Sequence, residues 1–362
     1  MRETSRPLTM LSIFPSFEVG GAQVRFTTLA NFFGARIRHK ICAINGNYSC
    51  TSLLHPGLAI ETLKLPIRKA DLWATRRQFR EVLRDKDPDV MLTHNWGSMD
   101  WVAANFPAIV PHVHIEDGFG VTEAKRQLLR RVVARNVLLR NSTVVVPSRT
   151  LEHIAKKIWL LPTHRVAYIP NGVDIEKYSI RRRSKLDDVP AIGTVAVLRP
   201  EKNLPRLLQA FRLVRSQRPC RLIIAGSGPE REKLEVLARE AGIAESVEFT
   251  GYRTDTENIY ASLDVFVLSS DTEQMPTSIL EAMAAGLPIV ATDVGDVRTL
   301  VSAENNPFIV NQDAGDIARG VISLLDSPEM RDSVGKANSG VARKQYSQGN
   351  MFRAYASLLQ LD

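Results

Sequence analysis

Short apolar runs alternate with longer amphipathic stretches along most of the chain. In the first half, these runs occupy residues 8–14, 39–45, 58–63, 89–95, 108–115, 142–148 and 166–172. Runs of this length between turn residues are typical of buried parallel strands, whereas the stretches between them have the periodicity of helices. A second series of predicted strands follows at residues 191–198, 221–226, 246–251, 263–270, 287–294 and 307–312.

A polar, charge-dense stretch at residues 179–190 separates the two series and is predicted to be a linker. Strand–helix alternation on both sides predicts an α/β protein with two doubly wound, Rossmann-like domains, at residues 1–180 and 190–345. Ligands of such sheets bind beyond the carboxyl ends of the strands, so we expect the two domains to face one another across a cleft. Residues 346–362 are predicted to form a C-terminal helix that packs back on the first domain.

Composition and charge narrow the functional classes. The 362 residues include 44% hydrophobic and 24% charged side chains, as expected of a globular protein with two cores. No apolar run approaches the roughly 20 residues that cross a bilayer, and we find no secretory signal. Three cysteines without metal-type spacing indicate a reducing compartment, so we expect a cytoplasmic protein. The net charge of +8 favours anionic partners, but no basic–aromatic stripe indicates nucleic acid.

The segment EQMPTSILE contains two carboxylates eight residues apart, Glu273 and Glu281, on either side of a predicted helix start. Pro276 suits a first helical turn, because its missing N–H would have no partner there. The free N–H groups of Thr277 and Ser278 then form an anion site, aided by the helix dipole. This arrangement suits a sugar linked through a diphosphate to a nucleoside, since both ends carry hydroxyls that bind carboxylates. Spacing alone also fits a capped surface helix with incidental glutamates.

Further motifs occur in order at residues 20–23 (GGAQ), 88–96 (PDVMLTHNW), 169–174 (IPNGVD), 198–203 (LRPEKN) and 223–234 (IIAGSGPEREKL). Together with the E-x7-E segment and its AMAAGLP continuation, they resemble the retaining glycosyltransferases of family 4 over nearly the whole chain. The resemblance implies the glycosyltransferase B architecture. It also implies transfer of a hexose-type sugar from a UDP- or GDP-sugar to a glycan or lipid-linked acceptor, in synthesis of a bacterial-type polysaccharide or glycolipid.

The resemblance assigns roles to residues of the second domain. Glu273 would bind hydroxyls of the donor sugar, Glu281 the nucleotide ribose, and Lys202 the departing nucleoside diphosphate. Met275 would contribute to the donor site. The loop at Gly226 lacks the third glycine of a dinucleotide fingerprint and would lie near the nucleoside. We expect no metal or other cofactor, because Lys202 and a helix N-terminus supply positive potential.

One position departs from the family pattern, because similar enzymes have an arginine where this chain has Val197. Arg199 lies two residues further on, and two steps along a strand return to the same face. If the strand continues that far, Arg199 substitutes for the missing arginine as a catalytic group. Otherwise Arg199 is a solvated loop residue, and both interpretations stay open.

The GGAQ motif follows the first predicted strand and opens a predicted helix. Residues without bulky side chains let a phosphate or a sugar approach the backbone closely, and a structural glycine turn is the alternative. By resemblance, Gly21 would lie beside the donor phosphates and the acceptor.

Histidines gather at the ends of two predicted strands of the first domain. His94 ends one strand, and His112 and His114 alternate on the next, which places both rings on one face. Glu116 or Asp117 could complete a metal site there, although structural or substrate-contacting histidines are commoner. By resemblance, His114 would contact the donor sugar or phosphate. The following EDGFG segment differs from the shorter His-Gly turn common in the family, so Glu116 and Asp117 could instead serve the acceptor, together with His94.

Residues 125–140 have helical periodicity and many arginines. On this helix one side gathers the apolar residues Leu128, Leu129, Val132, Val133 and Leu139. The other side gathers Arg126, Arg130 and Arg131. A packed helix with a solvated basic face is one interpretation. The other is peripheral contact of this basic helix with an anionic membrane surface, where a lipid-linked acceptor would be presented.

Two other functional classes fit the same architecture. A nucleotide-sugar epimerase would convert the donor without an acceptor. A non-catalytic partner protein would keep the scaffold and bind the donor without turnover, and Val197 is its best support. Glu273, Lys202 and Glu281 favour the transferase instead.

Overall fold

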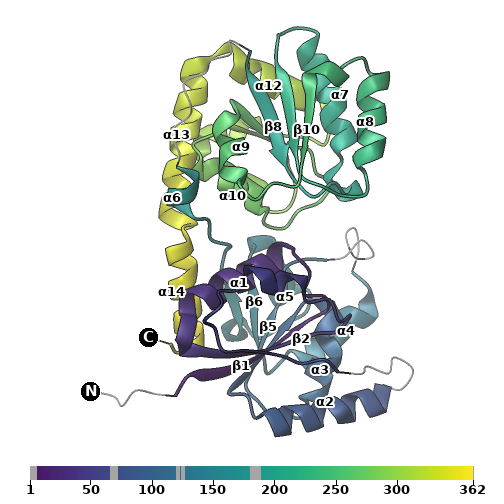
Figure 1. Ribbon diagram of the computed structural model, residues 1–362, viewed down its shortest axis with the longest axis vertical. Coiled ribbons are helices and arrows are strands. Elements are labelled where there is room, and N and C mark those ends of the chain that lie inside the picture. Colours follow the sequence, from purple (N-terminus) through teal and green to yellow (C-terminus); the bar gives the residue numbers. More distant parts are fainter. Residues whose placement is uncertain (1–5, 66–71, 120–122, 124–126, 180–188, 362) are drawn as a thin grey trace. The chain divides into compact units, whose positions relative to one another are not determined.

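The protein is described from a computed structural model that covers residues 6–65, 72–119, 123, 127–179 and 189–361. It divides into two compact units, the first Met1–Pro170 with Phe352–Asp362 and the second Asn171–Met351. Each unit contains a parallel β-sheet covered by helices (Figure 1). The prediction of an α/β protein with two Rossmann-like sheets is therefore confirmed.

Among the described residues, the first unit has a seven-stranded sheet in the order β3-β2-β1-β4-β5-β6-β7. Its strands are β1 (Leu8–Phe14), β2 (Ile37–Ala43), β3 (Ile60–Thr62), β4 (Val90–His94), β5 (His112–Ile115), β6 (Thr143–Val146) and β7 (Val166–Tyr168). Its helices are α1 (Gly21–Phe33), α2 (Leu72–Lys86), α3 (Met99–Ala104), α4 (Leu129–Leu138) and α5 (Arg149–Lys157).

The second unit has, over its described residues, a six-stranded sheet in the order β10-β9-β8-β11-β12-β13. Its strands are β8 (Ala191–Val195), β9 (Arg221–Ala225), β10 (Val247–Gly251), β11 (Val265–Leu268), β12 (Ile289–Thr292) and β13 (Ile309–Val310). Its helices are α6 (Ile175–Tyr178), α7 (Leu204–Arg215), α8 (Arg231–Glu240), α9 (Thr256–Ser262), α10 (Thr277–Ala284), α11 (Val297–Leu300), α12 (Ala314–Asp326) and α13 (Pro328–Gln345).

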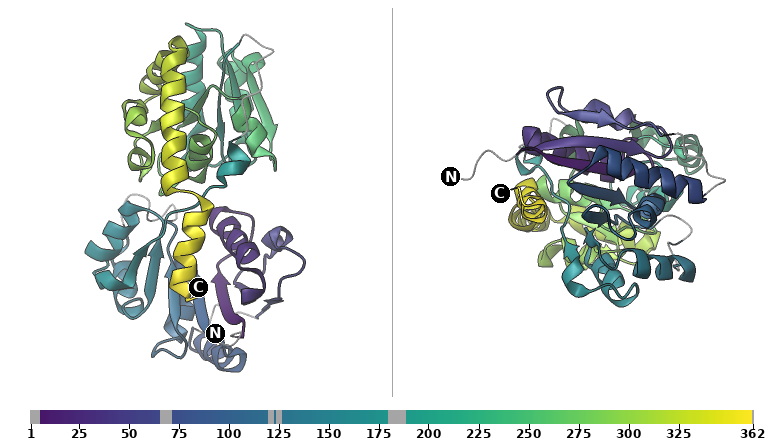
Figure 2. Two further views of the ribbon diagram at one scale, coloured as in Figure 1. Left: turned by 90° about the vertical axis from the view of Figure 1, so that its left-hand side faces the viewer. Right: turned by 90° about the horizontal axis from the view of Figure 1, so that it is seen from below.

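Helices cover both faces of the second sheet (Figures 1 and 2). Helices α7, α8 and α12 bury one face, and α9, α10 and α13 bury the other. The four residues of β11 are consequently all buried, which explains why its sequence, VFVL, is apolar without alternation. The doubly covered sheet leaves the carboxyl ends of its strands as the place for polar side chains.

The division between the units falls at Pro170, ahead of the boundary predicted at residue 180. The side-chain amide of Asn171 donates a 3.2 Å hydrogen bond to the carbonyl oxygen of Met275, and the N–H of Val173 donates to that of Tyr346 at 2.7 Å. These bonds attach the segment after Pro170 to the second unit. Most of the predicted linker, residues 180–188, lies outside the described residues.

The C-terminal helix α14 (Gln348–Leu359) begins in the second unit, and from Phe352 onward the chain belongs to the first. The ring of Phe352 stacks on that of Phe32 of α1, with centroids 3.9 Å apart. Tyr355 is buried in the same unit. Within the described residues, no helix combines the length and apolarity needed to span a bilayer.

Candidate active site

Lys202 and Glu273 form an ion pair at the point where the strand order of the second sheet reverses. Strands β8 and β11 are neighbours, but the chain leaves them toward opposite edges of the sheet. Ligands of doubly wound sheets bind at such a switch point, beyond the carboxyl ends of the strands. The Nζ of Lys202, after β8, lies 2.6 Å from Oε1 of Glu273, after β11. The hydroxyl of Ser270 donates a 2.8 Å hydrogen bond to the same oxygen.

The loop that carries Glu273 rests against the loop that follows β12. Gly295 has a φ of +54°, and a Cβ at this position would lie 2.2 Å from the carbonyl oxygen of Glu273. The N–H of Asp296 donates a 3.2 Å hydrogen bond to the carbonyl oxygen of Gln274. Glycine is the residue that tolerates both the positive φ and this contact. The glycine at position 295 therefore allows the two loops to pack closely and so determines the backbone position of Glu273.

Helix α10 starts directly after this loop and carries the second glutamate. Pro276 precedes the helix and supplies no side-chain cap, so the N–H groups of Thr277 and Ser278 have no acceptor within the helix. These N–H groups and the helix dipole suit an anion. Glu281 lies one turn further on, and its Oε2 accepts a 2.7 Å hydrogen bond from the hydroxyl of Tyr260. Burial raises the pKa of Glu281, although the hydrogen bond from Tyr260 opposes that rise.

Met275 was expected in the donor site, but the structure buries it. Its side chain is 6% exposed and belongs to the apolar core. The N–H of Asn171 donates to its sulfur at 3.2 Å. Met275 therefore anchors the backbone of the EQMPTSILE segment, and its place in the donor site stays a prediction.

The strand before the arginine candidate is shorter than predicted. β8 ends at Val195, and Arg199 lies in the exposed loop before Pro200. The backbone at Arg199 is still extended, with φ -116° and ψ 157°. Exposed Val197 and Arg199 flank buried Leu198. We expected Arg199 to replace the missing arginine only if the strand continued to that residue, and β8 does not. The side chains of Val197 and Arg199 nevertheless both face solvent.

The backbone explains the glycine at position 226 without any ligand. Gly226 has a φ of +139°, and a Cβ there would lie 1.8 Å from the carbonyl oxygen of Ala196. The glycine thus lets the chain after β9 pass directly over the end of β8. Proximity of Gly226 to a nucleoside stays a prediction.

In the first unit, the switch point lies between β1 and β4, and α1 starts after β1 at Gly21. A Cβ on Gly21 would meet no atom of the described structure within 4 Å. The space beside this helix start is therefore open, unlike the space at Gly226. Contact of Gly21 with a phosphate or sugar stays a prediction.

Arg25, one turn into α1, forms an ion pair that the sequence did not predict. Its Nη2 lies 2.6 Å from Oδ1 of Asp117, and the N–H of Asp117 donates to Oδ1 of Asn95 at 2.8 Å. The carboxylate of Asp117 raises the pKa of Arg25, although burial acts in the opposite direction. The Asp117 side chain remains 18% exposed. Of the residues predicted to bind the acceptor, Asp117 is thus the one within reach of a ligand.

The histidines lie inside the first unit. His94 is 2% exposed and stacks on Phe14, with ring centroids 3.9 Å apart. The Oγ1 of Thr93 lies 2.8 Å from Nε2 of His112 and from Nδ1 of the fully buried His114. Burial lowers the pKa of His112 to about 3 and that of His94 well below its usual value. Both rings are buried in the described structure. Ligand contacts of His94 and His114 stay predictions.

No group of three or more suitable side chains is placed to hold a metal ion in the described part of the chain. Glu116, one of the residues considered for such a site, is fully buried beside Arg135. The Nε of Arg135 lies 3.3 Å from Oε2 of Glu116, and its Nη1 lies 3.2 Å from Oε1 of Glu123. A buried charge of this kind needs its partner. Glu116 therefore has a structural partner in Arg135, and its contact with an acceptor stays a prediction.

This ion cluster turns part of the basic side of the predicted helix inward, although Arg130 stays exposed and Leu139 buried as predicted; residues 124–126 lie outside the described chain. Arg131 and Arg135 both pair with Glu123. The guanidinium of Arg135 lies 4.7 to 5.4 Å from the ring centres of Trp96, Phe119 and Trp159. An apolar stripe faces solvent instead, with exposed fractions of 77%, 54% and 50% for Leu129, Val133 and Val137. The prediction failed because other segments contribute the groups that bury these arginines.

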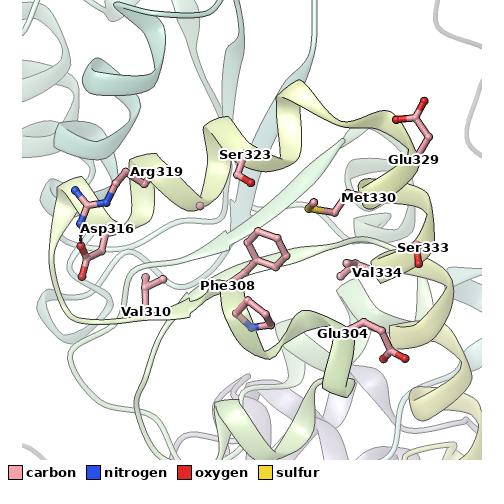
Figure 3. Close-up of a pocket in the computed structure, with 12 residues that line it drawn as sticks. Glu304, Phe308, Val310, Asp316, Arg319, Ser323, Glu329, Met330, Ser333 and Val334 are labelled. Carbon is pink, nitrogen blue, oxygen red and sulfur yellow. Dashed lines mark hydrogen bonds and ion pairs between the residues drawn. The ribbon is translucent and has the colours of Figure 1, made fainter.

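A separate groove of about 850 Å³ lies in the second unit between α12, α13 and the 3-10 helix Ala303–Phe308 (Figure 3). Phe308, Val334 and Met330 provide apolar lining, and the paired Asp316 and Arg319 lie at one end. None of the residues predicted to form the functional site lines this groove. The groove is therefore distinct from the cluster at Lys202.

Sequence analysis did not identify several side chains that bind predicted site residues. Ser270 binds Glu273, Tyr260 binds Glu281, and Arg25 binds Asp117. Ser270 is the last residue of the predicted strand 263–270, so its position near the site could have been predicted from the sequence. Tyr260 and Arg25 lie on other helices, where no local pattern distinguishes them.

Comparison with known proteins places both halves of the chain in described families. Residues 19–177 match the family described as "Glycosyltransferase Family 4", and residues 176–340 match "Glycosyl transferases group 1". The crystal structure of Anabaena HepE in complex with UDP-glucose has a similar fold, with a TM-score of 0.82 at 18% identity over 98% of this chain and 100% of that one.

Sequence relatives point the same way. An uncharacterized glycosyltransferase of Methanocaldococcus jannaschii is 29% identical over 232 residues, 60% of each chain. A GDP-mannose-dependent monoacylated alpha-(1-6)-phosphatidylinositol monomannoside mannosyltransferase of Corynebacterium glutamicum is 27% identical over 270 residues, 69% of this chain and 68% of that one. The chain thus spans about 60% of the length of the first relative.

Proposed function

Because the chain belongs to glycosyltransferase family 4, we propose that it moves a hexose-type sugar from a UDP- or GDP-sugar to a glycan or lipid-linked acceptor, with retention of anomeric configuration. The observation that carries this proposal is the cluster of Lys202, Glu273 and the start of α10 at the switch point of the second sheet. This cluster combines a cation, a helix N-terminus and a carboxylate, which are the groups that a sugar diphosphate needs.

In the proposed complex, the diphosphate binds between the ammonium of Lys202 and the N–H groups of Thr277 and Ser278. Glu273 accepts hydrogen bonds from hydroxyls of the sugar, and Glu281 accepts them from the ribose. Lys202 then exchanges part of its contact with Glu273 for the phosphate. The positive potential of these groups leads us to propose that the reaction needs no metal ion.

During transfer, the bond between the anomeric carbon and the diphosphate oxygen breaks, and a bond to the acceptor oxygen forms on the same face. The electron pair of the broken bond stays on the departing nucleoside diphosphate, which also takes the proton of the acceptor hydroxyl. Negative charge therefore grows on the phosphate next to Lys202. A fixed cation at this place stabilises the transition state more than the ground state.

A lipid-linked acceptor is the finer part of the proposal. The Corynebacterium relative is named for an acceptor that contains phosphatidylinositol. We propose that Asp117, whose side chain is 18% exposed, binds an acceptor hydroxyl. The apolar stripe of α4 (Leu129, Val133 and Val137) has the exposed Arg130 beside it. Apolar and basic side chains together favour an anionic membrane surface. We propose that the first unit contacts the membrane through this stripe.

The experiment that tests the donor site is thermal stabilisation against UDP-, GDP- and ADP-sugars, with the Glu281→Ala variant measured in parallel. Stabilisation by one nucleotide class that the variant loses would support the site and identify the base. If no nucleotide sugar stabilises the wild type at millimolar concentration, the proposal is wrong.

Two alternative functions, a nucleotide-sugar epimerase and a non-catalytic partner protein, predict different products from the donor that stabilises the protein. A nucleotide-sugar epimerase would convert the stabilising donor into its epimer without an acceptor. A non-catalytic partner would bind the donor but release no nucleoside diphosphate with any acceptor, and the missing arginine at Val197 is the observation that favours it. Product analysis of donor incubated with and without a glycan or lipid acceptor separates the three.

A further inference from the structure

Tyr260 holds the carboxylate of Glu281 from a neighbouring helix. Tyr260 lies on α9, which runs beside α10 in the second unit (Figure 1). Its hydroxyl donates to Oε2 of Glu281 at 2.7 Å and lies 3.3 Å from the carbonyl oxygen of Ser278. A hydroxyl has one hydrogen to donate, and the shorter distance identifies the carboxylate as its main acceptor.

The ring of Tyr260 has little freedom to move. It is fully buried between Tyr178 and Phe266, with ring centroids 5.5 Å and 5.7 Å away. The hydroxyl of Tyr178 lies 2.9 Å from Oγ1 of Thr256, which holds its ring against that of Tyr260. The packed ring of Tyr260 therefore holds the carboxylate of Glu281 through its hydroxyl, whereas a glutamate on an open helix face samples several rotamers.

Glu281 keeps capacity for a ligand after these contacts. A carboxylate has about four acceptor positions, and the hydroxyl of Tyr260 uses one of them. Glu281 is half-buried as a residue, whereas Tyr260 is fully buried. A carboxylate that is already oriented loses less conformational entropy when a ligand hydroxyl binds.

We infer that Tyr260 is a positioning residue for nucleotide recognition, because it orients Glu281 to accept a hydrogen bond from a ribose hydroxyl of a nucleoside diphosphate. This inference rests on the proposed function, which assigns the ribose to Glu281. It adds that recognition depends on the phenol hydroxyl of Tyr260. It also implies that the protein distinguishes ribonucleotides from nucleotides that lack the hydroxyl in question.

The test pairs a protein hydroxyl with a ligand hydroxyl. Dissociation constants are measured calorimetrically for UDP, GDP and ADP and for their 2′-deoxy and 3′-deoxy forms, with wild type and Tyr260→Phe. We expect the variant to bind its preferred nucleoside diphosphate about tenfold more weakly. For the deoxy form that lacks the recognised hydroxyl, wild type and variant should bind equally.

A merely structural role of Tyr260 gives another pattern. In that case Tyr260→Phe weakens binding of the ribonucleoside diphosphate and of both its deoxy forms by the same factor, and the inference is overturned. Because each comparison is made within one protein sample, partial unfolding of the variant does not change the ratio. In the Glu281→Gln background, Tyr260→Phe should add at most a further twofold loss, whereas an additional tenfold loss would contradict the inference.

Tyr48→Phe is the matched control. The hydroxyl of Tyr48 donates to the carbonyl oxygen of Leu63 at 2.6 Å in the first unit, away from α9 and α10. Its removal should leave all nucleotide affinities unchanged. If wild-type protein binds none of the three nucleoside diphosphates, the proposed function itself fails. Binding without a difference between ribose and deoxy forms overturns the inference alone.

Discussion

The ammonium of Lys202 lies 2.6 Å from the carboxylate of Glu273, although 71 residues separate them in the chain. Each side chain is thereby held in place at the end of its strand before any ligand binds. A donor that places its phosphate on Lys202 and its sugar on Glu273 meets both groups at one point. Catalysis in the proposed reaction should therefore depend on the charge at position 202.

Lys202→Met should reduce the rate of sugar transfer by about 10²- to 10³-fold, because the departing phosphate loses its cation. The measurement is release of nucleoside diphosphate from the donor that stabilises the wild type. Lys233→Met removes an equal charge from α8, where Lys233 pairs with Glu230 at 2.9 Å, and serves as the control. A rate for Lys202→Met within threefold of wild type would contradict the proposed role.

Gly295→Ala should displace Glu273, because the added methyl group would lie 2.2 Å from the carbonyl oxygen of that residue. Gly242→Ala is the matched control, since Gly242 also has a positive φ (+68°) but no neighbour of its Cβ position within 4 Å in the described structure. Both variants should lose about 1 kcal/mol of unfolding free energy from the strained backbone. Only Gly295→Ala should also lose stabilisation by the donor, as a thermal-shift titration would measure. Equal responses of the two variants to the donor would refute this account.

Stability should fall in mild acid because of buried histidines of the first unit. His39 is 1% exposed, and burial lowers its pKa from 6.5 to about 4. Between these values the unfolded chain binds a proton that the folded chain does not, so stability decreases as the pH falls. The contribution of His39 to the loss between pH 7 and pH 5 is about 2 kcal/mol.

The variant His39→Leu measures this contribution. Urea unfolding at pH 7 and pH 5 should show a smaller loss for His39→Leu than for wild type, by about 2 kcal/mol. His153→Leu, which replaces an exposed histidine of α5, is the control. If His39→Leu and wild type lose equal stability between the two pH values, His39 is not the source.

Sedimentation with lipid vesicles tests the apolar stripe of α4. Replacing Leu129, Val133 and Val137 by serine should reduce binding to vesicles that contain phosphatidylglycerol at least tenfold, since these side chains lose the apolar area that enters the interface. Leu213→Ser, at an exposed leucine of α7, is the control. Donor stabilisation should stay unchanged. Wild type that does not sediment with these vesicles would remove the membrane contact from the proposal.

The fold was largely predictable because each described strand overlaps a predicted apolar run. For β11, for example, the run 263–270 contains the observed Val265–Leu268. In a sheet covered on both faces, burial leaves continuous apolar runs that sequence alone reveals. The ends of strands were less predictable, as β8 shows by stopping at Val195. There the chain turns according to backbone contacts, such as that between Gly226 and Ala196.

The site was predictable only where local motifs carried it. Lys202 and Glu273 belong to recognisable segments, and the structure brings them together. Helical periodicity failed for α4, because a pattern along one helix does not show that Glu116 and Glu123 attract Arg135 inward. Tyr260 was missed for the same reason, since its partner Glu281 is 21 residues away on another helix.

The stacking of Phe352 on Phe32 has a consequence for how the chain is synthesised. The second unit is continuous, Asn171–Met351, whereas the first is interrupted and needs residues from Phe352 onward. A ribosome makes the strands of the first unit before residue 170, but it makes α14, which completes this unit, only after the whole second unit. During synthesis, the second unit is therefore complete before the first unit is. The first unit can complete its fold only after residue 352 has been made, and until then Phe32 lacks its stacking partner.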